Sequence, residues 1–234
     1  MKIEEIEKRY AYKFPKLFKE LWNNGMIDWM DGHQGSINDG KLWANEIYPK
    51  IKDNPPLLLH TGGFDFEMLQ NEEMLNWKFD ELWDVENHQF IPFAKTDEGN
   101  VYAFYKGIKT DGENAIVYIW NDMNETEVLA KNFEDFIFRK MLEAVYDVDK
   151  DELDADYKET GFNGYREDIL RDLNSIRPYL NEKYLVILED IYKDNQIIES
   201  SFSYGLCSNK KLVQIIKEYL DFEELDNVFE HELD

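Results

Sequence analysis

Apolar and polar positions alternate in short blocks along the chain, and the most regular block covers residues 90–105. Two apolar runs are joined there by the polar turn Asp97-Glu98-Gly99-Asn100, in which Gly99 is free to adopt a positive φ angle. On a strand, successive side chains point to opposite faces, and from Val101 to Tyr105 both sets are apolar or aromatic. The block therefore predicts a β-hairpin at the centre of a sheet whose two faces are both covered.

Apolar residues recur at helical spacing before this hairpin, over residues 2–10 and again from Pro15 to the stop signal Asn24-Gly25. After the hairpin, residues 115–120 and 126–130 predict strands, and Asn132 suits the N-cap of a helix. This part of the chain thus predicts a meander of strands flanked by helices. Weaker patterns predict a helix near residues 42–48, a strand over residues 57–61, a helical segment over residues 66–77 and an extended piece at residues 82–85.

The pattern changes beyond Tyr146, where an acid-dense run over residues 147–156 resembles a linker. Apolar residues further on recur only at helical spacing, and from residue 141 to the end 24 acidic residues face 10 basic ones. We therefore expect two parts. The first is an α+β domain at residues 1–146, with a central, mostly antiparallel sheet flanked by helices. The second is an all-helical, acidic extension at residues 147–234.

The composition adds a strong negative charge to this picture. The chain has 234 residues, of which 43% are hydrophobic, so it is long enough and apolar enough to bury a core. Direct binding to nucleic acid needs clustered Lys and Arg, whereas 50 acids outnumber 26 bases here and give a formal charge of −24. A basic protein partner fits this charge, although an acidic surface also serves simply to keep a protein in solution.

Three further features concern the cellular compartment. Cys207 is the single cysteine, which excludes an intramolecular disulfide and fits a reducing compartment. The N-terminus alternates charges and lacks the basic and apolar regions of a signal peptide. No apolar run reaches the roughly 18 residues that a membrane span requires. We expect a cytoplasmic protein that has no membrane partner.

Common catalytic and metal-binding motifs are missing from the sequence. The four histidines show no i, i+4 pair, and no glycine-rich phosphate loop or nucleophile elbow occurs. We therefore expect no metal and no cofactor. Paired carboxylates leave a glycosidase-type hydrolase as an alternative, although 50 acids produce such pairs by chance. These pairs are Asp65/Glu67, Asp84/Glu86 and Asp97/Glu98.

Tryptophans and turn carboxylates are the candidates for a contact surface. Trp22 and Trp77 fall in helical stripes and are predicted core residues, whereas the other candidates lie in loop-like stretches or hairpin turns. The predicted partner-binding residues are Trp29, Trp43, Trp83, Asp84, Glu86, Asp97, Glu98 and Asp111.

Four short motifs follow one another in a recognisable order: YKFPKLFKELWNNG at residues 12–25, FIPFA at 90–94, GNVY at 99–102 and FEDF at 133–136. Their order and spacing resemble the SUKH superfamily, of the yeast Smi/Knr cell-wall-assembly-regulator type. Members typically show an early LP helix that closes in NG, a central PFA strand pair and a terminal SF.EF helix. In this chain Phe14-Pro15 replaces LP and Asn24-Gly25-Met26 replaces NGG. Residues 29–56 and the tail past Tyr146 have no counterpart in these motifs.

The resemblance implies an α+β fold and, in bacteria, a role as an immunity protein. Such an antitoxin neutralises a polymorphic secreted toxin, often a nuclease, by direct protein–protein binding. We expect a non-enzymatic protein whose partner is a basic toxin domain. The alternative is a regulatory or scaffold protein without enzymatic activity, which resembles the eukaryotic branch and binds partners through its acidic surface. The family fold does not by itself fix the partner.

Overall fold

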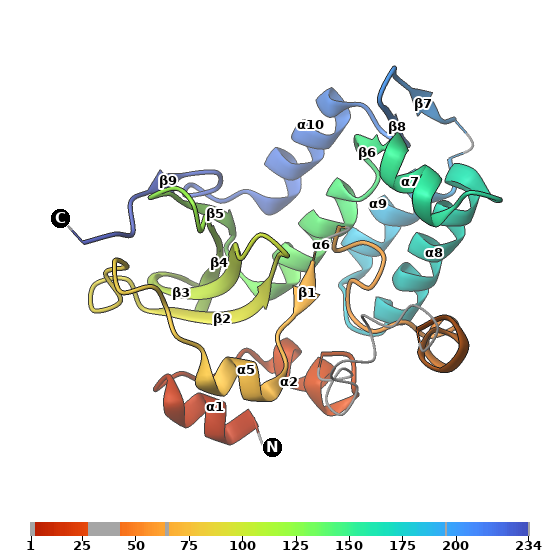
Figure 1. Ribbon diagram of the computed structural model, residues 1–234. Coiled ribbons are helices and arrows are strands. Elements are labelled where there is room, and N and C mark those ends of the chain that lie inside the picture. The colour runs from red at the N-terminus through yellow and green to blue at the C-terminus, as the bar shows by residue number, and fades with distance from the viewer. Residues whose placement is uncertain (1–2, 28–42, 64–65, 195, 234) are drawn as a thin grey trace. The chain divides into compact units, whose positions relative to one another are not determined.

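The computed structural model describes residues 3–27, 43–63, 66–194 and 196–233 (Figure 1). The chain forms two compact units that are interleaved along the sequence. The sheet unit comprises Met1–Asn24, Asp65–Phe136 and Leu220–Asp234, and the helical unit comprises Gly25–Phe64 and Ile137–Tyr219. These units do not divide the chain at residue 146. The prediction that residues 1–146 and 147–234 are separate domains asks whether each part folds alone, and it stays a prediction.

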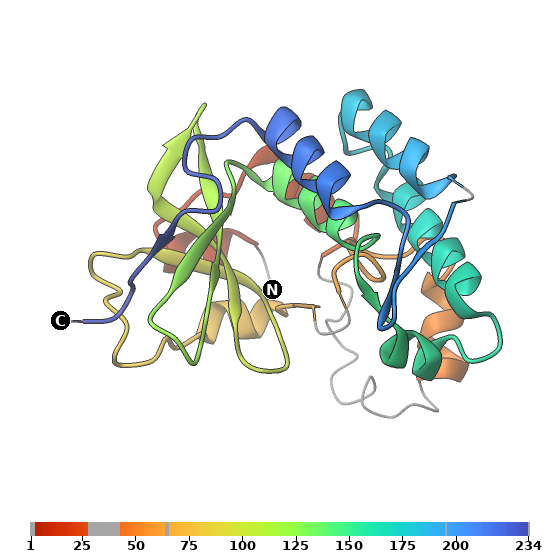
Figure 2. The same cartoon turned by 90° about the horizontal axis from the view of Figure 1, so that it is seen from above.

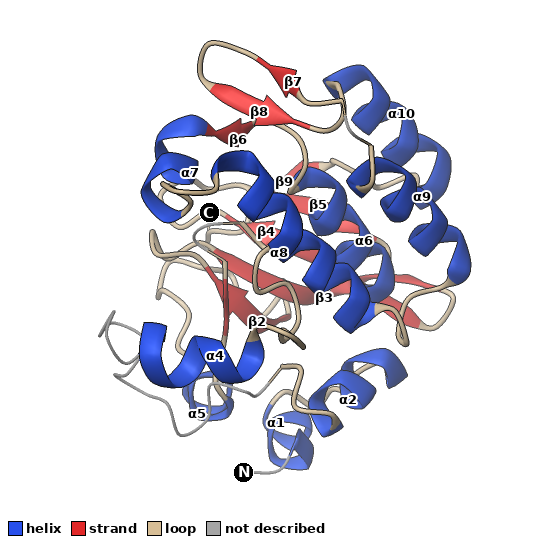
Figure 3. Cartoon of the chain, turned by 90° about the vertical axis from the view of Figure 1, so that its right-hand side faces the viewer, coloured by secondary structure: helices blue, strands red, loops and turns tan. Residues whose placement is uncertain are grey.

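Within the described residues, six strands form the sheet of the sheet unit, in the order β1-β2-β3-β4-β5-β9 and antiparallel at every pairing (Figure 3). The central hairpin is confirmed, since Phe90 pairs with Tyr105 and Gly99 takes a φ of 88° in its turn. The last strand comes from the C-terminal tail, which lies along the sheet beside β5 (Figure 2). The strands are β1 (Glu67–Met68), β2 (Phe90–Lys95), β3 (Val101–Thr110), β4 (Glu113–Ile119), β5 (Thr126–Ala130) and β9 (Val228–Phe229).

One face of this sheet carries an aromatic core under helices. Phe93 and Phe104 lie 5.1 Å apart between ring centroids, and Phe18 of α2 contacts Phe104 at 5.4 Å. Phe133, at the start of α6, meets Phe18 at 5.1 Å. All of these rings are fully buried, and truncating a buried Phe to Ala typically costs about 3–5 kcal/mol. The helices of this unit are α1 (Ile3–Arg9), α2 (Lys16–Asn23), α5 (Asn71–Asn76) and the first turn of α6 (Phe133–Glu143).

The opposite face is covered by segments without regular structure. A second cluster there joins Trp83 to Phe90 and to the small and branched residues of β3, β4 and β5. Phe222 and Phe229 of the C-terminal tail pack against this cluster. Both faces of the sheet are thus covered, as the two-sided apolar pattern predicts, but the second cover comes partly from residues more than 80 positions away in sequence.

The helical unit is built from helices and a small sheet in which β8 lies between β6 and β7 in the described residues. Helices α7 to α10 confirm helices in the C-terminal region, while the short strands correct the expectation that it is all-helical. The strands pair over only two residues at each contact, which is too short to give a period-two pattern. The elements are η1 (Trp43–Ile47, a π-helix), α4 (Tyr48–Ile51), β6 (Val148–Asp149), α7 (Lys150–Asp156), α8 (Gly161–Ile176), α9 (Glu182–Tyr192), β7 (Ile198–Glu199), β8 (Ser203–Gly205) and α10 (Asn209–Leu220).

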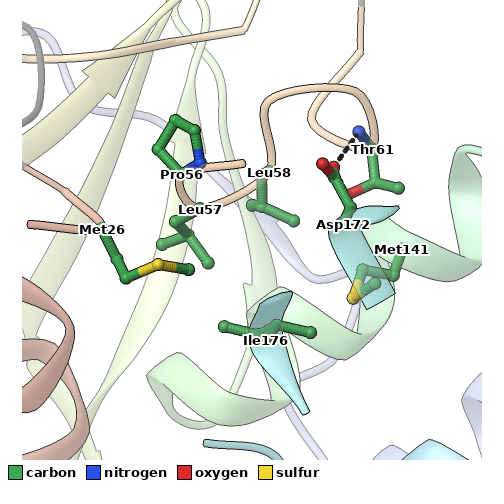
Figure 4. A pocket seen from close by; sticks show the side chains of 8 residues that line it. All are labelled: Met26, Pro56, Leu57, Leu58, Thr61, Met141, Asp172 and Ile176. Carbon is green, nitrogen blue, oxygen red and sulfur yellow. Dashed lines mark hydrogen bonds between the residues drawn. The ribbon is translucent and has the colours of Figure 1, made fainter. Parts of the chain in front are cut away.

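Residues 57–61 form turns, so the strand predicted there is wrong. Leu58 has a φ of 55°, which a strand does not allow. Leu57 and Leu58 are buried together with Met141 and Ile176 around a small pocket that leaves no room for a water molecule (Figure 4). Burial inside the helical unit, rather than strand pairing, therefore explains this apolar run.

Asp172 of α8 fastens this turn to the helix. Its Oδ2 accepts a hydrogen bond from the backbone N–H of His60 at 2.9 Å. It also accepts hydrogen bonds from Thr61, whose backbone N–H and hydroxyl both lie at 2.8 Å (Figure 4). Burial raises the pKa of the Asp172 carboxyl, and the electrostatic interaction with His60 and these hydrogen bonds oppose the rise. The carboxyl therefore holds the turn through three donors, of which the two on Thr61 are buried.

We predict that Asp172→Ala lowers the free energy of unfolding by at least about 2 kcal/mol, because a buried donor without an acceptor costs roughly 1–3 kcal/mol. Asp172→Asn keeps an acceptor oxygen at the same place and should lose clearly less. Urea denaturation of the two variants and the wild type measures the difference. Equal losses in both variants would show that the carboxyl's hydrogen bonds are not what secures the turn.

Candidate functional site

Five of the eight predicted partner-binding residues lie at one end of the sheet, around Trp83, Asp84 and the β2–β3 turn. Asp111 lies in the β3–β4 turn at the opposite end of β3, ten residues of strand away. Trp43 begins the π-helix of the helical unit, and Trp29 lies outside the described residues. Within the sheet unit, Asp111 is therefore separated from the other predicted partner-binding residues. The five that share one end are Trp83, Asp84, Glu86, Asp97 and Glu98.

Hydrogen bonds tie four chain segments together at this end. Asn121 of the β4–β5 turn donates its N–H to Asn100 Oδ1 of the β2–β3 turn at 2.8 Å. Asn124 Oδ1 accepts the N–H groups of His231 at 2.7 Å and Glu232 at 2.8 Å, which joins the same turn to the tail.

The tail then pairs with the segment that precedes β2. Leu233 donates its N–H to the Leu82 carbonyl at 2.8 Å, and Asp84 donates its N–H to the His231 carbonyl at 2.7 Å. We name this set of segments the acidic end of the sheet, comprising residues 82–86, 96–100, 120–125 and 230–233.

The acidic end has eight carboxylates and no lysine or arginine. Seven of these side chains are exposed, and Asp84 is partly exposed. Among the described residues none of the eight takes part in an ion pair. The nearest base in sequence, Lys95, instead contacts Glu73 at 2.8 Å and Glu67 at 3.6 Å. The carboxylates are those of Asp84, Glu86, Asp97, Glu98, Asp122, Glu125, Glu230 and Glu232.

Charge along the rest of the chain is distributed differently. Residues 79–94, 110–130 and 218–234 together contain 17 acidic residues and no lysine or arginine. The charge excess of the C-terminal region is concentrated in its last 17 residues, which contain eight acids and no lysine or arginine, and Leu220–Asp234 of these belong to the sheet unit. The helices at residues 147–217 carry 15 acids and 10 bases. The excess of acidic over basic residues is therefore larger in these segments than at residues 147–217.

Trp83 packs under the surface of the acidic end. Its side chain is buried, and its ring lies 5.6 Å from Phe79 and 4.7 Å from His231. The expectation that Trp83 is an exposed contact is corrected by this burial. Loop-like sequence around a tryptophan does not imply exposure, because the C-terminal tail covers the ring from a distant part of the chain.

His231 is the buried anchor of the tail. Its Nδ1 lies 3.0 Å from the Thr126 hydroxyl, and its Nε2 is buried without a hydrogen-bond partner among the described residues. Burial lowers the pKa of His231 below its usual value of 6.5, and the neighbouring His88 lowers it further. The neutral imidazole is therefore the form that fits the folded tail.

A loss of stability at mildly acidic pH follows from this shift. Between the lowered pKa in the folded protein and 6.5 in the unfolded chain, the unfolded chain binds more protons, so the free energy of unfolding falls as pH drops through this window. Urea midpoints measured from about pH 8 to about pH 5 should decrease, and His231→Gln should flatten this part of the curve. An unchanged slope in His231→Gln would assign the acid sensitivity to other groups.

The acidic end offers little for hydrolysis. A general acid of the glycosidase kind needs a raised pKa, whereas hydrogen bonds from Asn87 lower the pKa of Asp84. Glu86, Asp97 and Glu98 are exposed. In the described part of the chain no group of three His, Cys, Asp or Glu side chains is arranged to hold a metal ion. The arrangement presents charge at a surface.

The position of the tail is the main feature of this site that the sequence does not predict. The predicted helical extension includes Glu230, Glu232 and Leu233, although these residues lie beside Leu82 and Asn124. The sequence does contain one signal for this segment. Lysine and arginine occur in the helices up to Lys217 and are missing after it. Its position on the sheet depends on long-range pairing that composition does not reveal.

The fold and this surface define an α+β protein with a charged, open face at one end of its sheet. The model of the SMI1 / KNR4 family (SUKH-1) matches residues 2–139, and the chain belongs to this family. The match covers the strands from β1 to β5 and ends before the tail that supplies β9. No curated protein and no solved structure matches the chain.

Proposed function

We propose that this protein is an immunity protein that binds a secreted toxin domain directly and neutralises it without catalysis. Family membership supports a role of this general kind. The observation that carries the proposal is the cluster of eight carboxylates without an ion pair among the described residues. Unpaired like charges gathered on one surface create a negative field that attracts a basic partner.

The field fits a basic partner. A nuclease domain has a positive surface for phosphate groups, and an acidic surface steers encounter with it and occupies the same charges. Binding there would prevent the substrate from reaching the toxin's groove. The partner is therefore a basic toxin domain, and the protein does not itself contact nucleic acid.

The site of action we propose is the cytoplasm, where a toxin that enters the cell would meet its inhibitor. Among the described residues no helix is long and apolar enough to cross a membrane.

Co-expression tests the function. The toxin domain encoded by the neighbouring gene is produced in cells with and without this protein, and survival is measured. We expect full protection by the wild type and a one-to-one complex on size exclusion. Toxicity that persists despite abundant folded protein, together with no complex, would contradict the proposal and favour the regulatory or scaffold alternative.

A further inference from the structure

We propose that four exposed apolar side chains at the acidic end form the centre of the partner interface, so that the partner is a basic protein domain with an apolar patch amid its positive charge. This inference rests on the proposed function and adds the location of the contact. The four residues are Leu82, Val85, Met123 and Leu233.

These side chains are more exposed than apolar residues of their size usually are. Leu82 and Leu233 each have 59% of their surface exposed, and Val85 and Met123 have 43% and 42%. Single exposed apolar residues are common on proteins, whereas several at one place indicate an interaction surface. Their common location in the acidic end is therefore the informative observation.

Hydrogen bonds place the four residues close together. Leu233 donates its backbone N–H to the carbonyl of Leu82. Val85 follows Asp84, whose backbone N–H donates a hydrogen bond to the His231 carbonyl. Met123 precedes Asn124, whose side-chain oxygen accepts hydrogen bonds from the backbone N–H groups of His231 and Glu232. All four belong to segments that meet at the tail residues 231–233.

Carboxylates surround this apolar group in sequence and in space. Asp84 and Glu86 flank Val85, Asp122 precedes Met123, and Glu232 precedes Leu233. Protein interfaces have an apolar centre that excludes water and a polar rim, and the acidic end has this composition. Rim charges mainly set the association rate and its salt dependence, while the apolar centre mainly sets the dissociation rate.

The helical unit also carries exposed apolar side chains, which are rival candidates for the interface. Phe202, at the tip between β7 and β8, is 81% exposed, and Ile198 and Val213 are also exposed. Residues 200–217 contain three lysines and no acidic residue, but β8 pairs with Asp149 and Glu199, and Glu199 forms an ion pair with Lys150 at 2.7 Å. This part of the chain therefore lacks the group of unpaired carboxylates that attracts a basic partner to the acidic end. Charge complementarity therefore selects the acidic end.

Surface plasmon resonance with the toxin domain encoded by the neighbouring gene tests the location. In Leu82→Ser/Leu233→Ser we expect the dissociation rate to rise at least about 10-fold, and the association rate to change less than about 2-fold. The matched control is Val186→Ser/Val213→Ser in the helical unit, where the side chains are 58% and 56% exposed. This control should bind like the wild type. Met123→Ser supplies a second, single-site test should the double variant fold poorly.

The outcomes separate the location from the function. Unchanged dissociation in Leu82→Ser/Leu233→Ser and in Met123→Ser, with the wild type binding tightly, overturns the location and leaves the function standing. Faster dissociation in the control or in Phe202→Ser moves the interface to the helical unit and also overturns it. No binding by the wild type contradicts the proposed function itself. The wild type could also form a dimer that becomes a monomer in Leu82→Ser/Leu233→Ser. This result would show that the four apolar residues mediate self-association, and it would overturn the proposal.

Discussion

Association of the protein with its basic toxin domain is expected to slow at least about 10-fold at low salt when four carboxylates of the acidic end are neutralised. The variant is Asp97→Asn/Glu98→Gln/Asp122→Asn/Glu125→Gln. All four side chains are exposed, and none forms an ion pair among the described residues. Stopped-flow measurements over a range of salt concentrations report the rate, and the wild type should approach the rate of the variant as salt rises.

The same variant should be at least as stable as the wild type, because it removes repulsion and breaks no ion pair. A loss of binding together with equal or higher stability is the behaviour of a surface kept for function. The matched control removes the same charge from the helical unit in Asp154→Asn/Asp156→Asn/Glu159→Gln/Glu182→Gln, whose side chains are also exposed. If both variants slow association equally, net charge alone is responsible and the acidic end has no special role.

Ending the chain after Tyr219 is expected to unfold the sheet unit. The truncation removes β9 and the fully buried Leu220 and His231, and it uncovers Trp83. Each buried large side chain contributes about 2–5 kcal/mol, so the combined loss reaches the 5–15 kcal/mol that typically stabilises a domain. Circular dichroism should show a loss of strand signal, and urea denaturation should lack the cooperative transition of the sheet unit.

A milder change provides the control for this truncation. Val228→Ser alters the exposed residue of β9 and leaves the buried anchors in place, so it should shift stability by less than about 1 kcal/mol. A truncated chain that unfolds cooperatively like the wild type would mean that residues 1–219 fold without the tail. This result would support the predicted domain boundary at residue 146 and contradict a stabilising role of β9.

Local patterns predicted the parts of the fold that depend on neighbours in sequence. The hairpin from Phe90 to Tyr105 was predictable because two apolar runs flank a turn with glycine at its positive-φ position. The helix after Asn132 was predictable because this side chain caps it, accepting the Asp135 N–H at 2.8 Å. In both cases the signal lies within a few residues.

Long-range pairing accounts for most of the errors. The apolar run at residues 57–61 has strand composition, but it is buried as turns held by Asp172, more than 110 positions away. Trp83 is buried because His231 covers it, and β9 exists because Thr126 has Phe229 as its partner. No periodicity near any of these residues specifies its distant partner.

The candidate site was predictable in part. Asp84, Glu86, Asp97 and Glu98 were identified as polar turn positions, and hydrogen bonds through the tail and the β4–β5 turn connect their segments. Asp111 has the same character and lies at the other end, since turn chemistry does not tell which end of a sheet a turn occupies. The tail carboxylates were misplaced because a strand of two residues leaves no pattern.

Hydrogen–deuterium exchange of the protein, free and bound to the toxin domain of the neighbouring gene, tests the proposed interface most directly. Binding should slow exchange at residues 82–86, 120–125 and 230–233, while residues 197–217 of the helical unit should exchange as in the free protein. Protection confined to residues 197–217, with the acidic end unchanged, would contradict an interface at the acidic end.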